Sequence, residues 1–261
     1  MKGRAYRITE LHLHNFRSFR GKTCIEFHPS ITCITGHCGT GKTSMLEAIR
    51  WVLGESSETS LRAGSMQDLI YMPMSGSLKN PFAEVIVVSG RGTVTRRIDN
   101  NGVTEWLTSA SPGSKRGISG MLAGGEQGSL SFAYIASEMI GRMASGQDHH
   151  GPAAPGDDFE YSYTGKNECP FERLSIGERT VIYADFLLAS CRRNRHPLLL
   201  FDGFDAPLDN EQCHILMKQL KSMAEYSQII MISHHRPVIN GADLVYEVNM
   251  DKNGVSTISE R

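Results

Sequence analysis

The sequence predicts an α/β protein with mixed sheets that are covered by helices and divided into two lobes. Residues 6–35 begin with alternating apolar and polar side chains, which is typical of antiparallel strands with one solvated face. Residues 197–201 and 228–233 are short, almost wholly apolar runs that alternate with helical stretches, a pattern that favours a parallel sheet with both faces covered. A glycine-rich loop joins an apolar run, residues 31–35, to an amphipathic helix, residues 44–53.

That loop, residues 36–43, fits the P-loop pattern of Gly, four residues and then Gly-Lys-Ser/Thr. Glycines let the backbone curl so that successive N–H groups point at phosphate oxygens, and the following helix adds the positive end of its dipole. Lys42 would then reach the β- and γ-phosphates, and the Thr43 hydroxyl would ligate Mg²⁺. The expected nucleotide-binding residues are Gly36, His37, Cys38, Gly39, Thr40, Gly41, Lys42, Thr43 and Ser44.

Two further motifs extend this expected site. Residues 198–202 form an apolar strand that ends in Asp202, the acid that helps to hold Mg²⁺ in P-loop proteins. Residues 174–178 precede a helix, and Ser175 with Glu178 predicts a capping box at its start. The same geometry leaves N–H groups and a serine hydroxyl able to meet a phosphate.

Taken together, residues 174–178, 198–202, 205–209 and 232–234 resemble the signature, Walker B, D-loop and switch histidine of ABC ATPases. Within that superfamily, the chain resembles the head domain of SMC proteins. The stretches that carry this closer resemblance are residues 13–19, 47–55, 60–71 and 241–246. It covers residues 6–107 and 172–259.

The resemblance implies an ATP sandwich, in which the P-loop of one head faces the signature of another and ATP holds the two heads together. Ser175 and Gly177 would contact the γ-phosphate across the interface. Arg62 would match the arginine-finger-like loop of SMC heads. The resemblance also implies that Lys42, Asp202 and His234 take part in catalysis and that Thr43 and Asp202 bind the metal. It implies that the signature, which would act in trans, consists of Leu174, Ser175, Gly177 and Glu178. Asp205 and Asp209 would couple the two sites.

The same resemblance implies a function in chromosome organisation, segregation or DNA repair, with ATP and Mg²⁺ as cofactors. The implied partners are the same or a related head, DNA and accessory proteins. The location would be cytoplasmic and nucleoid-associated, or nuclear in a eukaryote. A RecF-like repair ATPase stays open as an alternative. The motor of a membrane transporter is disfavoured by the Leu-Arg-x-Gly segment at residues 61–64 and by the early P-loop.

Three departures from the family pattern are visible. Gly203 stands where the family has a glutamate that polarises the attacking water, so we expect ATP binding with slow hydrolysis unless Asp205 or the partner head supplies an acid. A non-hydrolysing, nucleotide-gated interaction module is therefore a second hypothesis. The glutamine at the lobe junction is absent near residues 136–137. The long coiled coil is replaced by a predicted flexible linker, residues 146–171, between an N-terminal lobe, 1–145, and a C-terminal lobe, 172–261.

Composition sets outer bounds on function. The formal net charge is −1, so any nucleic-acid surface would be a local patch. No apolar run approaches the ~20 residues that span a bilayer, and the basic N-terminus lacks the apolar core of a secretory signal. The six cysteines are scattered without a Cys-x-x-Cys pair, which predicts a reducing compartment and no zinc site. His12 and His14 share a strand face, but no third metal ligand is visible from the sequence.

Overall fold

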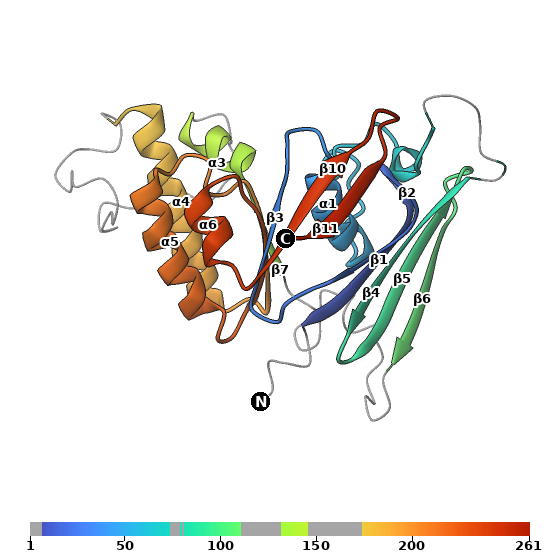
Figure 1. The fold of residues 1–261 in the computed structure, drawn as a ribbon, viewed down its shortest axis with the longest axis horizontal. Helices are drawn as coiled ribbons and strands as arrows, with labels where there is room; N and C mark the ends of the chain where they lie inside the picture. The colour runs from blue at the N-terminus through green and yellow to red at the C-terminus, as the bar shows by residue number, and fades with distance from the viewer. Residues whose placement is uncertain (1–6, 74–78, 80, 111–131, 146–173) are drawn as a thin grey trace.

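The chain folds into two β-sheets with one helix between them and a layer of helices on the far side of the second sheet (Figure 1). The computed structural model describes residues 7–73, 79, 81–110, 132–145 and 174–261. The predicted linker, residues 146–171, lies outside the described residues. The mixed α/β architecture with two sheets confirms the predicted fold class.

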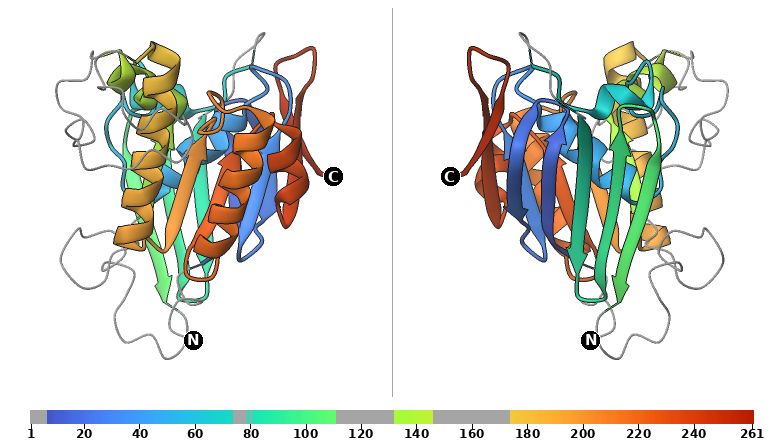
Figure 2. Two further views of the ribbon diagram at one scale, coloured as in Figure 1. Left: turned by 90° about the vertical axis from the view of Figure 1, so that its left-hand side faces the viewer. Right: turned by 90° about the vertical axis from the view of Figure 1, so that its right-hand side faces the viewer.

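The first sheet is antiparallel, in the order β2-β1-β4-β5-β6. Alternation along β1 puts Leu11 and Leu13 in the core and leaves Glu10 and His12 on the outer face, as a period of two requires. Among the described elements, none covers that outer face (Figure 2, right). The strands are β1 (Ile8–Phe16), β2 (Phe19–Glu26), β4 (Phe82–Ser89), β5 (Gly92–Asp99) and β6 (Thr104–Ala110).

The second sheet is mostly parallel and does not follow chain order, running β11-β10-β3-β9-β8-β7. The P-loop strand β3 (Ile31–Thr35) therefore lies between β9 (Gln228–Ile232) and β10 (Leu244–Met250). Both faces are buried, which explains the unbroken apolar runs. The remaining strands are β7 (Phe132–Ala136), β8 (Leu198–Asp202) and β11 (Ser256–Glu260), of which β11 pairs antiparallel with β10.

Helices cover both faces of this second sheet, and the sheet separates the interior into two cores. Helix α1 (Lys42–Val52) lies between the sheets, where Leu198 and Leu200 face it across the first core. Leu199 and Phe201 point the other way, into the second core. That core lies under the outer helices, which face the viewer in Figure 2, left. Those helices are α3 (Ser137–Ala144), α4 (Ile176–Asn194), α5 (Asn210–Met223) and α6 (Arg236–Gly241), and a short 3₁₀ helix, η2, spans Met66–Leu69.

The C-terminus of α1 is held by an arginine from the first sheet. Arg96 Nη1 donates to the carbonyls of Trp51 and Glu55, each at 2.7 Å. Its guanidinium also lies between the rings of Trp51 and Trp106, with centroids 4.7 and 4.4 Å away. Arg96 therefore ties the C-terminal end of α1 and the turn after it to β5 and β6.

No helix among the described residues combines the length and apolar character needed to cross a membrane.

One buried amide joins the two sheets. Gln228, at the start of β9, accepts from Ile8 N at 2.8 Å and donates to Ile8 O at 2.7 Å and to His28 O at 3.1 Å. The Gln228 side chain thus pairs with the backbone N–H and carbonyl of Ile8, as a neighbouring strand would.

We expect Gln228→Leu to lower the free energy of unfolding by about 2–4 kcal/mol, because it leaves buried backbone groups without partners. Urea denaturation followed by circular dichroism measures the change. The exposed Gln67 provides the control, and Gln67→Leu should stay within about 0.5 kcal/mol of the parent. Equal stabilities of the two variants would contradict the role given to Gln228.

Candidate nucleotide-binding site

The P-loop follows β3 along a path that only glycine can take at two points. Gly36 has φ 136°, and a Cβ there would stand 2.2 Å from the carbonyl oxygen of Val248. Gly41 has φ 97°, and its Cβ would stand 2.6 Å from the hydroxyls of Ser18 and Ser256. The predicted glycine pattern is thus explained by close backbone approach as well as by left-handed torsion angles.

Lys42 lies across the loop rather than pointing away from it. Its Nζ donates to the carbonyls of Gly36 at 2.8 Å and His37 at 2.6 Å, and burial lowers the pKa of its ammonium group. A hollow of about 370 Å³ opens beside it. The hollow is lined by Arg17, Gly39, Gly41, Lys42, Thr43, Ser44, Glu47 and Arg62.

Helix α1 begins at this hollow with its first N–H groups uncommitted to a side chain. Gly41 occupies the cap position, no side chain caps the helix, and the first turn carries no acidic residue. The positive end of the helix dipole is therefore available to an anion at the position where the P-loop pattern predicts phosphates.

Oxygen-bearing side chains from the first turn of α1, from β7 and from the end of β8 meet next to Lys42. Thr43 Oγ1 lies 3.4 Å from Asp202 Oδ1, and Tyr134, on β7, donates its hydroxyl to Asp202 Oδ2 at 3.3 Å. Burial and the charge of Asp202 raise the pKa of Tyr134 to about 12, so its hydroxyl stays protonated. A carboxylate beside a hydroxyl suits Mg²⁺, which prefers oxygen ligands.

Arg62 links a second acid, Glu138, to Asp202. Its Nη2 lies 3.5 Å from Asp202 Oδ2 and 3.4 Å from Glu138 Oε1. Glu138 sits in the first turn of α3, directly after β7, and its side chain is 69% exposed. Glu138 is a residue that the sequence reasoning missed, although its place next to the expected junction at residues 136–137 was a signal.

Gly203 leaves the expected position of a catalytic glutamate without a side chain. Its φ is 62°, and a Cβ there would lie 3.4 Å from Ser137 Oγ. A glutamate at this position would have to adopt a left-handed backbone or shift the strand end. Asp205 does not replace it, because its side chain is 1% exposed and accepts from the Ser233 hydroxyl.

His234 follows β9 and, with Gly36, His37 and Cys38, lines a different hollow of about 890 Å³. Burial lowers the pKa of the imidazole, and the positive charge of Lys42 lowers it further. The ring is therefore neutral at pH 7 and can accept or donate one hydrogen bond.

The predicted signature lies at the exposed tip of α4. Ser175 caps the helix, its Oγ accepting from Glu178 N at 3.3 Å and donating to Glu178 Oε2 at 2.9 Å. Leu174 is buried, whereas Ser175 and Gly177 are exposed and Ile176 is 63% exposed. The predicted capping box is confirmed, and it presents a serine and a helix N-terminus to the outside.

The two predicted D-loop acids have different surroundings. Asp209 is exposed and caps α5 by accepting from Gln212 N at 2.8 Å, whereas Asp205 is buried beneath the loop. Burial raises the pKa of Asp205. Their part in coupling two heads stays a prediction.

The sequence reasoning also missed an ion pair at the hollow. Arg17 Nε lies 3.3 Å from Glu47 Oε2, and Glu47 is only 4% exposed. Burial raises the pKa of Glu47, although Arg17, Arg62 and Arg50 oppose that shift. Both residues stand in stretches that carry the family resemblance, which was the available signal.

The P-loop, the strand-end acid and the sheet order define a head of the ABC-ATPase fold. The family described as "RecF/RecN/SMC N terminal domain" matches residues 7–257, and the chain belongs to that family.

Solved SMC heads share this fold. The SMC head domain from Thermotoga maritima aligns with a TM-score of 0.68 at 23% identity, covering 98% of this chain and 99% of that one. An SmcHead bound to the C-winged helix domain of ScpA aligns with a TM-score of 0.73 at 21% identity, covering 97% of each chain.

Among curated relatives, the "Chromosome partition protein Smc" of Halobacteriovorax marinus is 30% identical over 154 residues. That alignment covers 52% of this chain and 13% of the relative, so the chain spans a small part of the length of such proteins.

Proposed function

We propose that this chain is an SMC-like head that binds ATP with Mg²⁺ and forms a dimer around it. The observation that carries the proposal is Lys42 held across the P-loop beside the Thr43 and Asp202 pair. Lys42 and the N-terminus of α1 would bind the phosphates, and Thr43 with Asp202 would hold Mg²⁺. The exposed Ser175 tip of α4 would clasp the γ-phosphate held by the neighbouring head.

The proposal extends to the cellular role. The relatives are chromosome partition proteins, which supports work in chromosome organisation or segregation. The likeness to a head bound to a winged-helix domain of ScpA supports an accessory protein of that kind as a partner. DNA as a partner follows from the proposed role, and so does association with the chromosome.

The proposal is tested by the mass of the particle in solution. With ATP and Mg²⁺, light scattering should give about twice the monomer mass, and with ADP or no nucleotide it should give the monomer. One mass under all three conditions would overturn the proposed dimer while leaving ATP binding to be measured by calorimetry.

Weak hydrolysis is part of the proposal, and Glu138 is the acid that supports it. Its carboxylate shares Arg62 with Asp202 and is largely exposed, so it would be free to turn toward a water beside a bound Mg²⁺. In this arrangement the general base comes from the start of α3 rather than from the end of β8, where Gly203 stands.

We expect Glu138→Gln to lower steady-state phosphate release by at least about tenfold, the low end of what a positioned base contributes. ATP affinity and the ATP-dependent mass should not change. Glu211→Gln, on the exposed first turn of α5, is the matched control. An unaffected rate would remove Glu138 from the chemistry.

Gly203 favours a second candidate, a nucleotide-gated interaction module that binds ATP without turnover. It shares every binding residue with the first. Tight ATP binding and dimerisation with no measurable phosphate release would select it. A RecF-like repair ATPase, which also lacks long arms, is the remaining alternative. Sedimentation with supercoiled and gapped DNA would separate the two roles.

A further inference from the structure

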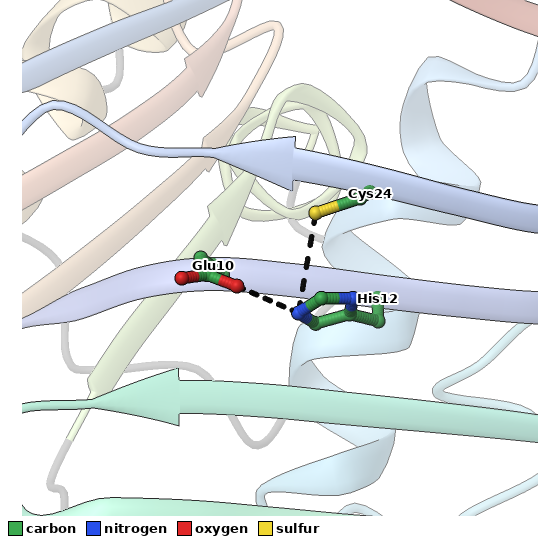
Figure 3. A group of neighbouring side chains, drawn as sticks. All are labelled: Glu10, His12 and Cys24. Carbon is green, nitrogen blue, oxygen red and sulfur yellow. Dashed lines mark hydrogen bonds and ion pairs between the residues drawn. The ribbon is translucent and has the colours of Figure 1, made fainter.

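A second cluster of chemistry-bearing side chains lies on the outer face of the first sheet (Figure 3). It consists of Glu10 and His12 on β1 and Cys24 on β2, and we call it the outer-face cluster. One donor atom from each residue lies within 4.8 Å of the others. We propose that the outer-face cluster is a zinc site.

Strand geometry brings these side chains together. Glu10 and His12 are two residues apart on one strand, so they share a face, and Cys24 is the direct cross-strand partner of His12. The same ring atom, His12 Nε2, faces both neighbours, with Glu10 Oε2 at 2.8 Å and Cys24 Sγ at 3.9 Å. Tetrahedral zinc with ordinary bond lengths sets such atoms about 3.3–3.6 Å apart, between the two observed distances.

The chemistry of the three donor atoms favours zinc over other divalent ions. Imidazole nitrogen, thiolate sulfur and carboxylate oxygen together suit zinc, whereas Mg²⁺ and Ca²⁺ prefer oxygen alone. Three protein ligands leave a fourth position for water. His14 does not take part, because its ring packs edge-on against Phe82 with centroids 4.8 Å apart.

Charge at the outer-face cluster also favours a cation. Glu26 lies on β2 directly opposite Glu10, and two like charges in cross-strand positions repel. Partial loss of hydration raises the pKa of the Cys24 thiol, and the charges of Glu10 and Glu26 raise it further, so the thiol is protonated until a metal displaces the proton. A bound divalent ion would relieve the repulsion and fasten the edge strand β2 to β1.

The sequence alone pointed away from this site, because the cysteines are scattered and no third ligand accompanied the histidines. The antiparallel pairing of β1 with β2 supplies that ligand in Cys24. The site is independent of the proposed ATPase function.

Cobalt(II) titration tests the proposal, because thiolate ligation gives a near-ultraviolet charge-transfer band. The full chain should carry Cys38→Ser and Cys169→Ser, since Cys38 is exposed and Cys169 lies outside the described residues. In this background we expect one equivalent of Co²⁺ to produce the band and Zn²⁺ to abolish it.

Adding Cys24→Ser should remove the band. Adding His12→Gln or Glu10→Gln should weaken Co²⁺ binding by more than the ~10–100-fold that loss of a supporting residue costs. His14→Gln, on the same strand face, should bind like the background. The mutated side chains are at least partly exposed, so circular dichroism without metal should match the background. A band that survives Cys24→Ser, or binding unaffected by both His12→Gln and Glu10→Gln, would overturn the zinc site.

Discussion

Lys42→Met should reduce ATP affinity at least about 100-fold, because each charge-assisted hydrogen bond to a phosphate is worth about 1.5–3 kcal/mol and the ammonium reaches more than one oxygen. Lys42 Nζ donates to the carbonyls of Gly36 and His37, which hold it within the loop. The partial loss of hydration that lowers its pKa also strengthens its attraction for an anion. Isothermal titration calorimetry with ATP and Mg²⁺ measures the loss.

Lys218→Met is the matched control, since Lys218 is an exposed lysine on α5. It removes the same charge and should leave ATP affinity unchanged. Thermal unfolding of both variants separates a binding defect from a folding defect. Equal ATP affinities for Lys42→Met and the parent would refute the phosphate site.

Ser175→Asp should abolish the ATP-dependent dimer while each head still binds ATP. Aspartate caps a helix as well as serine does. It loses the bond that the serine hydroxyl donates to Glu178 Oε2 but can keep the two backbone bonds of the capping box, so α4 should keep its start. Its carboxylate would, however, face the γ-phosphate of the neighbouring head, and like charges at an interface cost several kcal/mol. Light scattering with ATP should then report the monomer, with dimerisation weakened at least about 100-fold.

Ser175→Asn provides the decisive comparison. Asparagine has the size of aspartate and caps equally well, but it is neutral and can donate to a phosphate. It should retain more of the dimer than aspartate. If both variants dimerise like the parent, the tip of α4 does not meet the nucleotide.

Local patterns were sufficient for most elements. The predicted amphipathic helix at residues 44–53 is α1, and the apolar run at 228–233 is β9. Elements were missed where their signals are weak. Strand β6 is an edge strand with polar and exposed positions, and α6 is a single short helix with a proline in its first turn.

The contacts that assemble the site could not be predicted from the sequence, because they join segments that are far apart in the chain. Glu138 meets Arg62 only once β7 pairs with β8, and no spacing rule relates the two residues. The left-handed backbone of Gly203 is likewise set by the turn after β8. The Walker B pattern showed that the expected glutamate is replaced by Gly203, whereas the fold showed that Glu138 lies near Asp202.

The place of β3 between β9 and β10 has a consequence for biosynthesis. Ser256 Oγ lies 2.8 Å from the Thr40 carbonyl oxygen, and Gly36 passes against Val248, so strands from the far end of the sequence buttress the phosphate cradle. A nascent polypeptide whose first half has left the ribosome can form the first sheet, but its P-loop still lacks the strands that support it. The proposed nucleotide binding should therefore require the translation of β10 and β11, and a gene divided between β6 and β7 should give two fragments that bind ATP only after mixing.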